Sequence, residues 1–110
     1  MLLNIIVFKN VKINAFTNPN YTDVEPEKAA KGLERAIIAN FESDAKLVKS
    51  YENLDMYYIG TFDDETGVIV YHEPKFLFSP RETILKLVSE QVAKQKVLES
   101  NADEVEEGDH

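Results

Sequence analysis

Three consecutive acidic residues, Asp63, Asp64 and Glu65, form the densest group of candidate metal ligands or acid–base groups in the chain. They lie in the stretch YYIGTFDDETG, residues 57–67. A hard cation such as Ca²⁺ takes about six or more oxygen ligands at a characteristic spacing, and this stretch lacks the EF-hand pattern. A metal site would therefore need ligands from elsewhere in the chain, and we predict none here.

A hairpin turn at residues 63–67 explains the same spacing without a ligand. Gly67 can supply the positive φ of such a turn, and the Asp63 carboxylate can accept a hydrogen bond from the backbone two residues later. We therefore predict Gly60, Asp63 and Gly67 as structural residues of a hairpin. The pairing that follows places Phe62 opposite Val68, Gly60 opposite Val70 and Tyr58 opposite His72.

Residues for enzymatic catalysis are scarce. The chain has no cysteine, and its sequence contains no GxSxG motif, phosphate-binding P-loop or Rossmann fingerprint. Asp63 and Asp64 are adjacent on an expected exposed turn, where no burial would raise a carboxyl pKa. His72 lies in an expected strand near Tyr58, which favours a packing or hydrogen-bonding role. We predict no catalytic residue and no cofactor.

Aromatic and basic side chains are the remaining candidate chemistry. Single-stranded nucleic acid is bound by aromatic rings that stack on bases and by cations that follow the phosphates. The alternative is that these rings are ordinary core and rim residues, as most aromatic side chains are. The candidate nucleic-acid-binding residues are Lys9, Lys12, Phe16, Tyr21, Tyr58 and Lys75.

The hydrophobic pattern predicts strands in both halves of the chain. Residues 2–8 are apolar at both alternating sets of positions, which indicates an inner strand covered on both faces. Residues 11–16 alternate cleanly after a bend at Lys9 and Asn10. Strands at residues 55–62 and 68–73 flank the predicted turn, and residues 43–55 contain a possible short strand, AKLV.

Two helices complete the expected fold. Pro26 opens an apolar periodicity over residues 26–41, and the sequence SPRE at residues 79–82 has the form of a capping box before a helix that reaches about Lys96. The order of elements predicts an α+β fold, an antiparallel sheet with two helices packed mainly on one face.

Acidic and basic residues are distributed unequally along the chain. The net charge is −8, yet residues 1–96 hold all 12 basic residues and 14 of the 20 acidic ones. We predict one domain at residues 1–97 and a disordered acidic tail at residues 98–110. The sequence offers no secretory signal and no run of about 18–20 apolar residues, so we expect a cytosolic protein without a membrane span.

Two segments resemble the small nonstructural protein of the gokushovirus-type microviruses, which are bacteriophages with circular single-stranded DNA. The segments are FKNVKINAFTNPNY (residues 8–21) and LDMYYIGTFDDETGVIVYHEPKFLF (residues 54–78), and the likeness covers about residues 1–80. The positions that carry it are Phe8, Val11, Lys12, Phe16, Pro19, Tyr21, Tyr57, Gly60, Phe62, Asp63, Thr66, Gly67 and Pro74.

The resemblance implies a non-enzymatic accessory protein of viral genome replication, present in the cytoplasm of the infected bacterium and absent from the mature virion. It favours binding of single-stranded DNA, by a homodimer or larger homo-oligomer. The alternative is a protein–protein adaptor that acts on the replication initiator, capsid precursors or a host factor without contacting nucleic acid. The nearly neutral residues 1–96 favour the adaptor, because strong DNA-binding domains usually show a basic excess.

Overall fold

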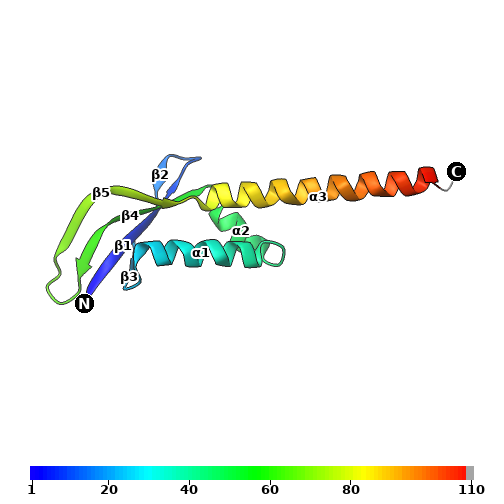
Figure 1. The fold of residues 1–110 in the computed structure, drawn as a ribbon. Helices are drawn as coiled ribbons and strands as arrows, with labels where there is room; N and C mark the ends of the chain where they lie inside the picture. The colour runs from blue at the N-terminus through cyan, green and yellow to red at the C-terminus, as the bar shows by residue number, and fades with distance from the viewer. Residues whose placement is uncertain (109–110) are drawn as a thin grey trace.

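The computed structural model describes the backbone of residues 1–108 and the side chains of residues 1–98. It shows a curled antiparallel sheet and three helices (Figure 1). The sheet consists of β1 (Leu2–Asn10), β2 (Ala15–Phe16), β3 (Asn20–Thr22), β4 (Leu54–Asp63) and β5 (Ile69–Phe78). The mixed α and β composition and the antiparallel sheet confirm the predicted class.

β1 is the inner strand that its sequence predicts. It pairs with β4 along its whole length on one side, and with β2 and β3 on the other. Ile5, Ile6 and Val7 are all buried, which explains why both alternating sets of positions are apolar. β5 is left as the outer strand beyond β4.

The predicted strand at residues 11–16 is wrong except for its last two residues, which form β2. Residues 11–14 are a turn. The Asn10 side-chain oxygen accepts hydrogen bonds from the backbone N–H groups of Lys12 (3.0 Å) and Ile13 (3.3 Å), and Asn14 has φ of 53°. A side chain that bonds its own backbone competes with strand pairing, so the alternation of apolar residues does not decide the conformation here.

Helix α1 (Pro26–Asn40) confirms the predicted helix and covers the side of the sheet that carries Ile6 and Phe8. Ala30 of α1, Ile6 and Met56 form the centre of the core. The partly buried side chains packed around them are Phe8, Ala29, Leu33, Leu77 and Phe78.

Residues 45–51 form a helix, α2 (Ala45–Tyr51), where a short strand was the expectation. Asp44 caps it, because its carboxylate accepts a hydrogen bond from the backbone N–H of Leu47 at 3.0 Å. Tyr51 at its end packs edge-to-face on Phe8, with ring centroids 5.6 Å apart. The structure therefore has three helices and not two.

Helix α3 (Pro80–Gly108) begins where the SPRE sequence predicts. Ser79 Oγ accepts a hydrogen bond from the backbone N–H of Glu82 at 3.0 Å, which is one half of the predicted capping box. Beyond the end of α1 the helix extends away from the rest of the chain (Figure 1), and the longest dimension of the molecule is 78 Å. No helix of the described residues is long and apolar enough to cross a membrane.

The backbone of α3 is helical twelve residues past Lys96, where the predicted helix ends. The side chains from Glu99 onward lie outside the described residues. The mobility of the acidic residues 98–110 in solution stays a prediction.

Candidate nucleic-acid interface

The acidic stretch at residues 63–67 is a turn built from its own hydrogen bonds. The Asp63 carbonyl oxygen accepts from the Gly67 N–H at 2.7 Å, and the Asp63 carboxylate accepts from the Glu65 N–H at 2.9 Å. Gly67 has φ of 75°, in the left-handed region that glycine adopts without strain. These hydrogen bonds and the φ of Gly67 explain why Asp63 and Gly67 are spaced as D-x-x-x-G: both are residues of the hairpin turn.

The pairing beside the turn is displaced by one residue from the predicted register. The Asp63 N–H donates to the Val68 carbonyl at 2.9 Å, so Val68 is opposite Asp63 and not opposite Phe62 as predicted. An irregularity between Tyr58 and Gly60 shifts the register again. The observed pairs are Phe62 with Ile69, Gly60 with Tyr71 and Tyr58 with Lys75.

The turn makes stability depend on pH through Asp63. The Glu65 N–H, hydrogen-bonded to the Asp63 carboxylate, holds the pKa of that carboxyl below its usual value of 3.8. A carboxyl with a lowered pKa in the folded state stabilises the fold above its unfolded pKa, and this contribution is lost as pH falls through the folded pKa.

We expect Asp63→Asn, which keeps an acceptor oxygen, to remove this pH dependence. Its melting temperature should lie close to that of the wild type at pH 7, and the wild type should lose more stability than the variant below about pH 4. Thermal melts followed by circular dichroism at a series of pH values measure both. Parallel curves for the two proteins would contradict the assignment to Asp63.

One side of the sheet collects aromatic side chains. Residues opposite each other on neighbouring strands share a face, and the register joins Val7, Tyr57 and Phe76 in one row and Lys9 with Phe16 in the next. This side is opposite to the one that carries Ile6 and Phe8, because side chains alternate along β1. We call it the aromatic face, and its members are Phe16, Tyr21, Tyr57, Phe62, Tyr71 and Phe76.

The rings of the aromatic face contact one another edge-to-face. Tyr57 lies between Phe16 and Phe76, with ring centroids 5.8 Å apart on each side. Tyr21 and Phe62 form a second pair at 5.5 Å. Such pairs hold the rings in fixed orientations.

Several of these rings remain open to solvent. The exposed fractions are 51% for Phe16, 65% for Tyr71 and 57% for Phe76. The Lys9 ammonium lies 5.7 Å from the centroid of the Phe16 ring. Exposed rings beside a cation are the groups that bind bases and phosphates of a single strand.

A groove of about 380 Å³ lies beside Phe16 and Tyr71 of the aromatic face. Its lining is mostly apolar and aromatic, with Thr17 and His72 as polar members, and includes Val7, Phe16, Pro19, Ile59 and Tyr71. Its position next to exposed rings offers space for a planar group that stacks on Phe16 or Tyr71.

The six predicted binding residues do not all lie on the same side of the sheet. Lys9, Phe16 and Tyr21 lie together on the aromatic face, and Lys12 lies in the adjoining turn at residues 11–14. Tyr58 and Lys75 are opposite each other and opposite Ile6, on the other side of the sheet.

Four members of the aromatic face were not among the predicted binding residues: Tyr57, Phe62, Tyr71 and Phe76. Alternation counted from the sequence does not find the correct side, because Ile59 interrupts it in β4 and residues 72–74 interrupt it in β5. Ile5 pairs with Gly60 and Ile6 with Tyr58, so Ile59 has no partner on β1.

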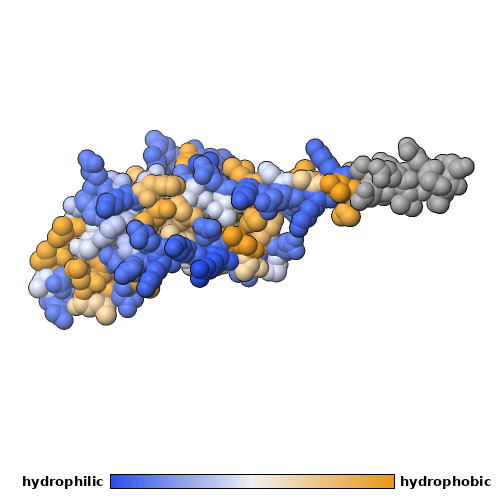
Figure 2. All heavy atoms as spheres, in the orientation of Figure 1, coloured by the Kyte–Doolittle hydropathy of each residue, from blue (hydrophilic) through white to orange (hydrophobic). Residues whose placement is uncertain are grey.

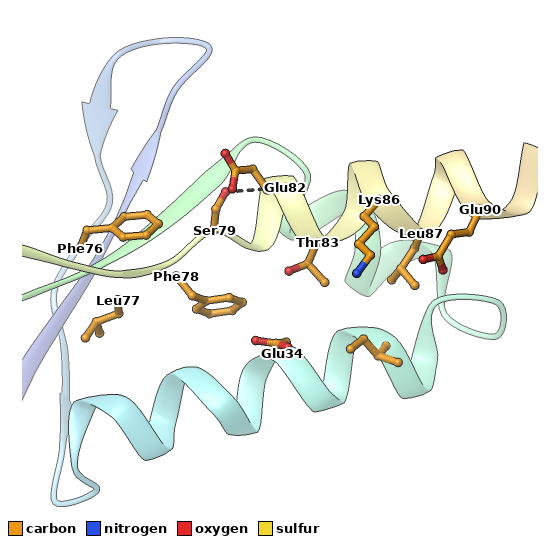
Figure 3. A pocket seen from close by; sticks show the side chains of 11 residues that line it. Glu34, Phe76, Leu77, Phe78, Ser79, Glu82, Thr83, Lys86, Leu87 and Glu90 are labelled. Atoms are coloured by element: carbon orange, nitrogen blue, oxygen red, sulfur yellow. Dashed lines mark hydrogen bonds between the residues drawn. The ribbon is translucent and has the colours of Figure 1, made fainter.

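A second cavity, of about 500 Å³, lies between α1 and α3 (Figure 3). Glu34 approaches it from α1, while Thr83, Lys86 and Glu90 approach it from α3. A phosphate in this cavity would meet more carboxylates than cations. The aromatic face is therefore the better candidate for nucleic acid.

Hydrophobic and polar residues alternate over the visible surface (Figure 2). Hydrophobic side chains gather near the β4–β5 hairpin, where Val68, Ile69 and Val70 are exposed. A second group lies along α3 and includes Val92, Val97 and Leu98.

Comparisons of the chain with protein-family models, with curated proteins and with solved structures found no match. The geometry of the aromatic face is therefore the basis for the functional assignment that follows.

Proposed function

We propose that the protein is a non-enzymatic accessory protein that binds single-stranded DNA through its aromatic face. The observation that carries the proposal is the cluster of Phe16, Tyr57 and Phe76, whose rings pack edge-to-face beside Lys9. The rings offer stacking surfaces for bases, and Lys9 and Lys12 offer cations for phosphates. The proposal uses the side of the sheet that lies opposite to α1.

The sequence resemblance described above supports a role in replication of a circular single-stranded DNA phage. In that setting the protein acts in the cytoplasm of the infected bacterium, outside the mature virion. Binding should be weak at physiological salt, because residues 1–96 carry 14 acidic against 12 basic residues.

Fluorescence anisotropy with a labelled oligothymidylate of about 15 nucleotides tests the proposal. The affinity should fall as salt rises, with a slope of about −0.7 in log K against log salt for each phosphate that a lysine contacts. Lys9→Gln should lower the affinity and reduce the slope by about that amount. Phe16→Ala should weaken binding roughly 5- to 150-fold, the loss of about 1–3 kcal/mol from one stacked base.

Lys75→Gln is the matched control, because it removes the same charge from the other side of the sheet. It should leave both the affinity and the salt slope close to those of the wild type. Equal losses for the two lysine variants would place any binding elsewhere than the aromatic face.

The second candidate is a protein–protein adaptor, and the exposed apolar residues of α3 favour it. Leu85, Val88 and Val92 are 56%, 41% and 46% exposed along one side of that helix. A helix stripe of this kind suits a partner helix better than a nucleic acid. Absence of oligonucleotide binding at about 50 mM salt, by a protein that is folded by circular dichroism, would favour the adaptor.

A further inference from the structure

The groove beside the aromatic face adjoins an irregular part of the sheet. Residues 72–74 of β5 stand opposite the single residue Ile59 of β4. His72 and Pro74 from this bulge line the groove, whereas Glu73 between them is not part of the lining. The bulge therefore brings an imidazole ring to a groove whose walls are mostly apolar.

A hydrogen bond fixes the tautomer of the His72 ring. His72 Nδ1 lies 2.7 Å from the Glu73 carbonyl oxygen, and a carbonyl oxygen can only accept, so Nδ1 carries the hydrogen. In the neutral ring Nε2 then holds a lone pair. The Tyr58 ring packs edge-to-face on the imidazole, with centroids 4.6 Å apart, and helps to hold its orientation. Nε2 makes no hydrogen bond within residues 1–98, so its lone pair is available to a ligand.

Thr17, the other polar residue named in the lining, is already engaged within the chain. Its Oγ1 accepts a hydrogen bond from the Phe8 N–H at 3.1 Å, and its hydroxyl donates to the Asn18 carbonyl oxygen at 3.4 Å. Of these two residues, His72 is therefore the one that offers an acceptor to a ligand.

The groove and its surroundings offer three kinds of contact. Phe16 and Tyr71 present aromatic surface to a planar group. His72 Nε2 can accept a hydrogen bond from an N–H on the edge of that group. The Lys9 ammonium, 5.7 Å from the centroid of the Phe16 ring, attracts an anion joined to it. A flat ring that carries N–H donors and is joined to an anion is a nucleotide.

We propose that the groove holds one base of the bound strand and that His72 Nε2 accepts a hydrogen bond from an N–H group on the edge of that base. The inference rests on the proposed function, because the strand supplies the base. Each of the four DNA bases has an N–H donor on its Watson–Crick edge. His72 is thus a contact for any base, as suits a protein that binds single strands without reading their sequence.

A chemically modified oligonucleotide tests the contact with the full chain. Methylation of N3 on every base of an oligothymidylate of about 15 nucleotides removes the N–H donor of thymine and keeps the ring and the phosphates. Fluorescence anisotropy at about pH 8, where imidazole rings are neutral, compares the two strands. The methylated strand should bind the wild type about 2- to 12-fold more weakly, the effect of one lost hydrogen bond.

His72→Phe removes the acceptor and keeps an aromatic ring beside Tyr58. Once circular dichroism shows that it is folded, this variant should bind both strands equally, about 2- to 12-fold more weakly than the wild type binds the unmethylated strand. Lys75→Gln, on the other side of the sheet, is the control and should keep the wild-type difference between the strands. Equal binding of both strands by the wild type, or a difference that persists in His72→Phe, would overturn the contact and leave the proposed function in place.

Nucleosides test the groove without a strand. In nitrogen–proton correlation spectra, thymidine at millimolar concentration should shift the backbone amide signals of Thr17, Tyr71 and His72, and N3-methylthymidine should shift them less. Such shifts in a protein that binds no oligonucleotide would support the groove as a base site and contradict the proposed function. Equal shifts from the two nucleosides, or none from thymidine, would overturn the inference.

Discussion

Gly60→Ala is expected to destabilise the protein by about 3–5 kcal/mol, the range of severe core and backbone substitutions. A Cβ atom at this position would overlap the Val70 carbonyl oxygen and lie 3.0 Å from the Val70 carbonyl carbon and 3.1 Å from Tyr71 Cα. These atoms are backbone of the neighbouring strand and cannot rotate away. Gly60 also has φ of 155°, at the edge of the region that L-residues rarely adopt.

Thermal or urea denaturation followed by circular dichroism measures this loss. For a domain of this size, each kcal/mol lowers the melting temperature by about 4–8 °C. Gly32→Ala is the matched control, since nothing lies within 4 Å of a Cβ there and the residue is helical. It should stabilise the protein by about 0.5–1 kcal/mol, and a comparable loss in both variants would contradict the steric explanation.

Asp55→Ala should cost about 2–4 kcal/mol, because Asp55 connects the sheet to the start of α3. Asp55 is only 8% exposed. Its carboxylate accepts a hydrogen bond from Ser79 Oγ at 2.5 Å and lies 3.5 Å from Nη2 of Arg81. Removing the carboxylate leaves a buried hydroxyl without this acceptor and a partly buried guanidinium without its counter-charge.

Asp55→Asn separates the two contributions. The amide oxygen can still accept from Ser79, so only the charge opposite Arg81 is lost and the decrease in unfolding free energy should be smaller. The free energies come from urea titrations of the three proteins at pH 7. If Asp55→Ala unfolds at the same urea concentration as the wild type, the contact of Asp55 with Ser79 and Arg81 does not hold α3 on the sheet.

Local signals in the sequence identify most of the elements correctly. Pro26 followed by apolar residues at helical spacing predicts α1, and Ser79 followed by Pro80 marks the start of α3. Apolar residues at both alternating sets of positions identify β1 as an inner strand. These signals are reliable because each is contained within one element.

The predictions that are wrong depend on features that the apolar pattern does not report. The apolar residues of AKLV are compatible with a helix or a strand, and the Asp44 cap favours the helix α2. Asn10 folds residues 11–14 into a turn in the same way, through its own side chain.

The candidate interface is harder to predict because it depends on register. One extra residue, Ile59, breaks the alternation within β4, so that Tyr58 and Gly60 lie on opposite sides of the sheet although they are two residues apart. Tyr58, one of the predicted binding residues, lies opposite Ile6 on the side of α1, although alternation counted back from Gly60 and Phe62 would place it on the aromatic face, where its neighbour Tyr57 lies. Counting alternate residues cannot locate such an insertion, because the partner strand determines where it falls.

The projection of α3 also determines how the molecule behaves in solution. The radius of gyration is 19.8 Å, whereas a compact domain of this length has about 13 Å. An elongated particle experiences more friction than a sphere of equal mass, so it diffuses more slowly and leaves a gel-filtration column earlier. A single copy of this 12.5 kDa chain would thus elute at the volume of a larger globular protein, and its elution volume alone would overstate its mass.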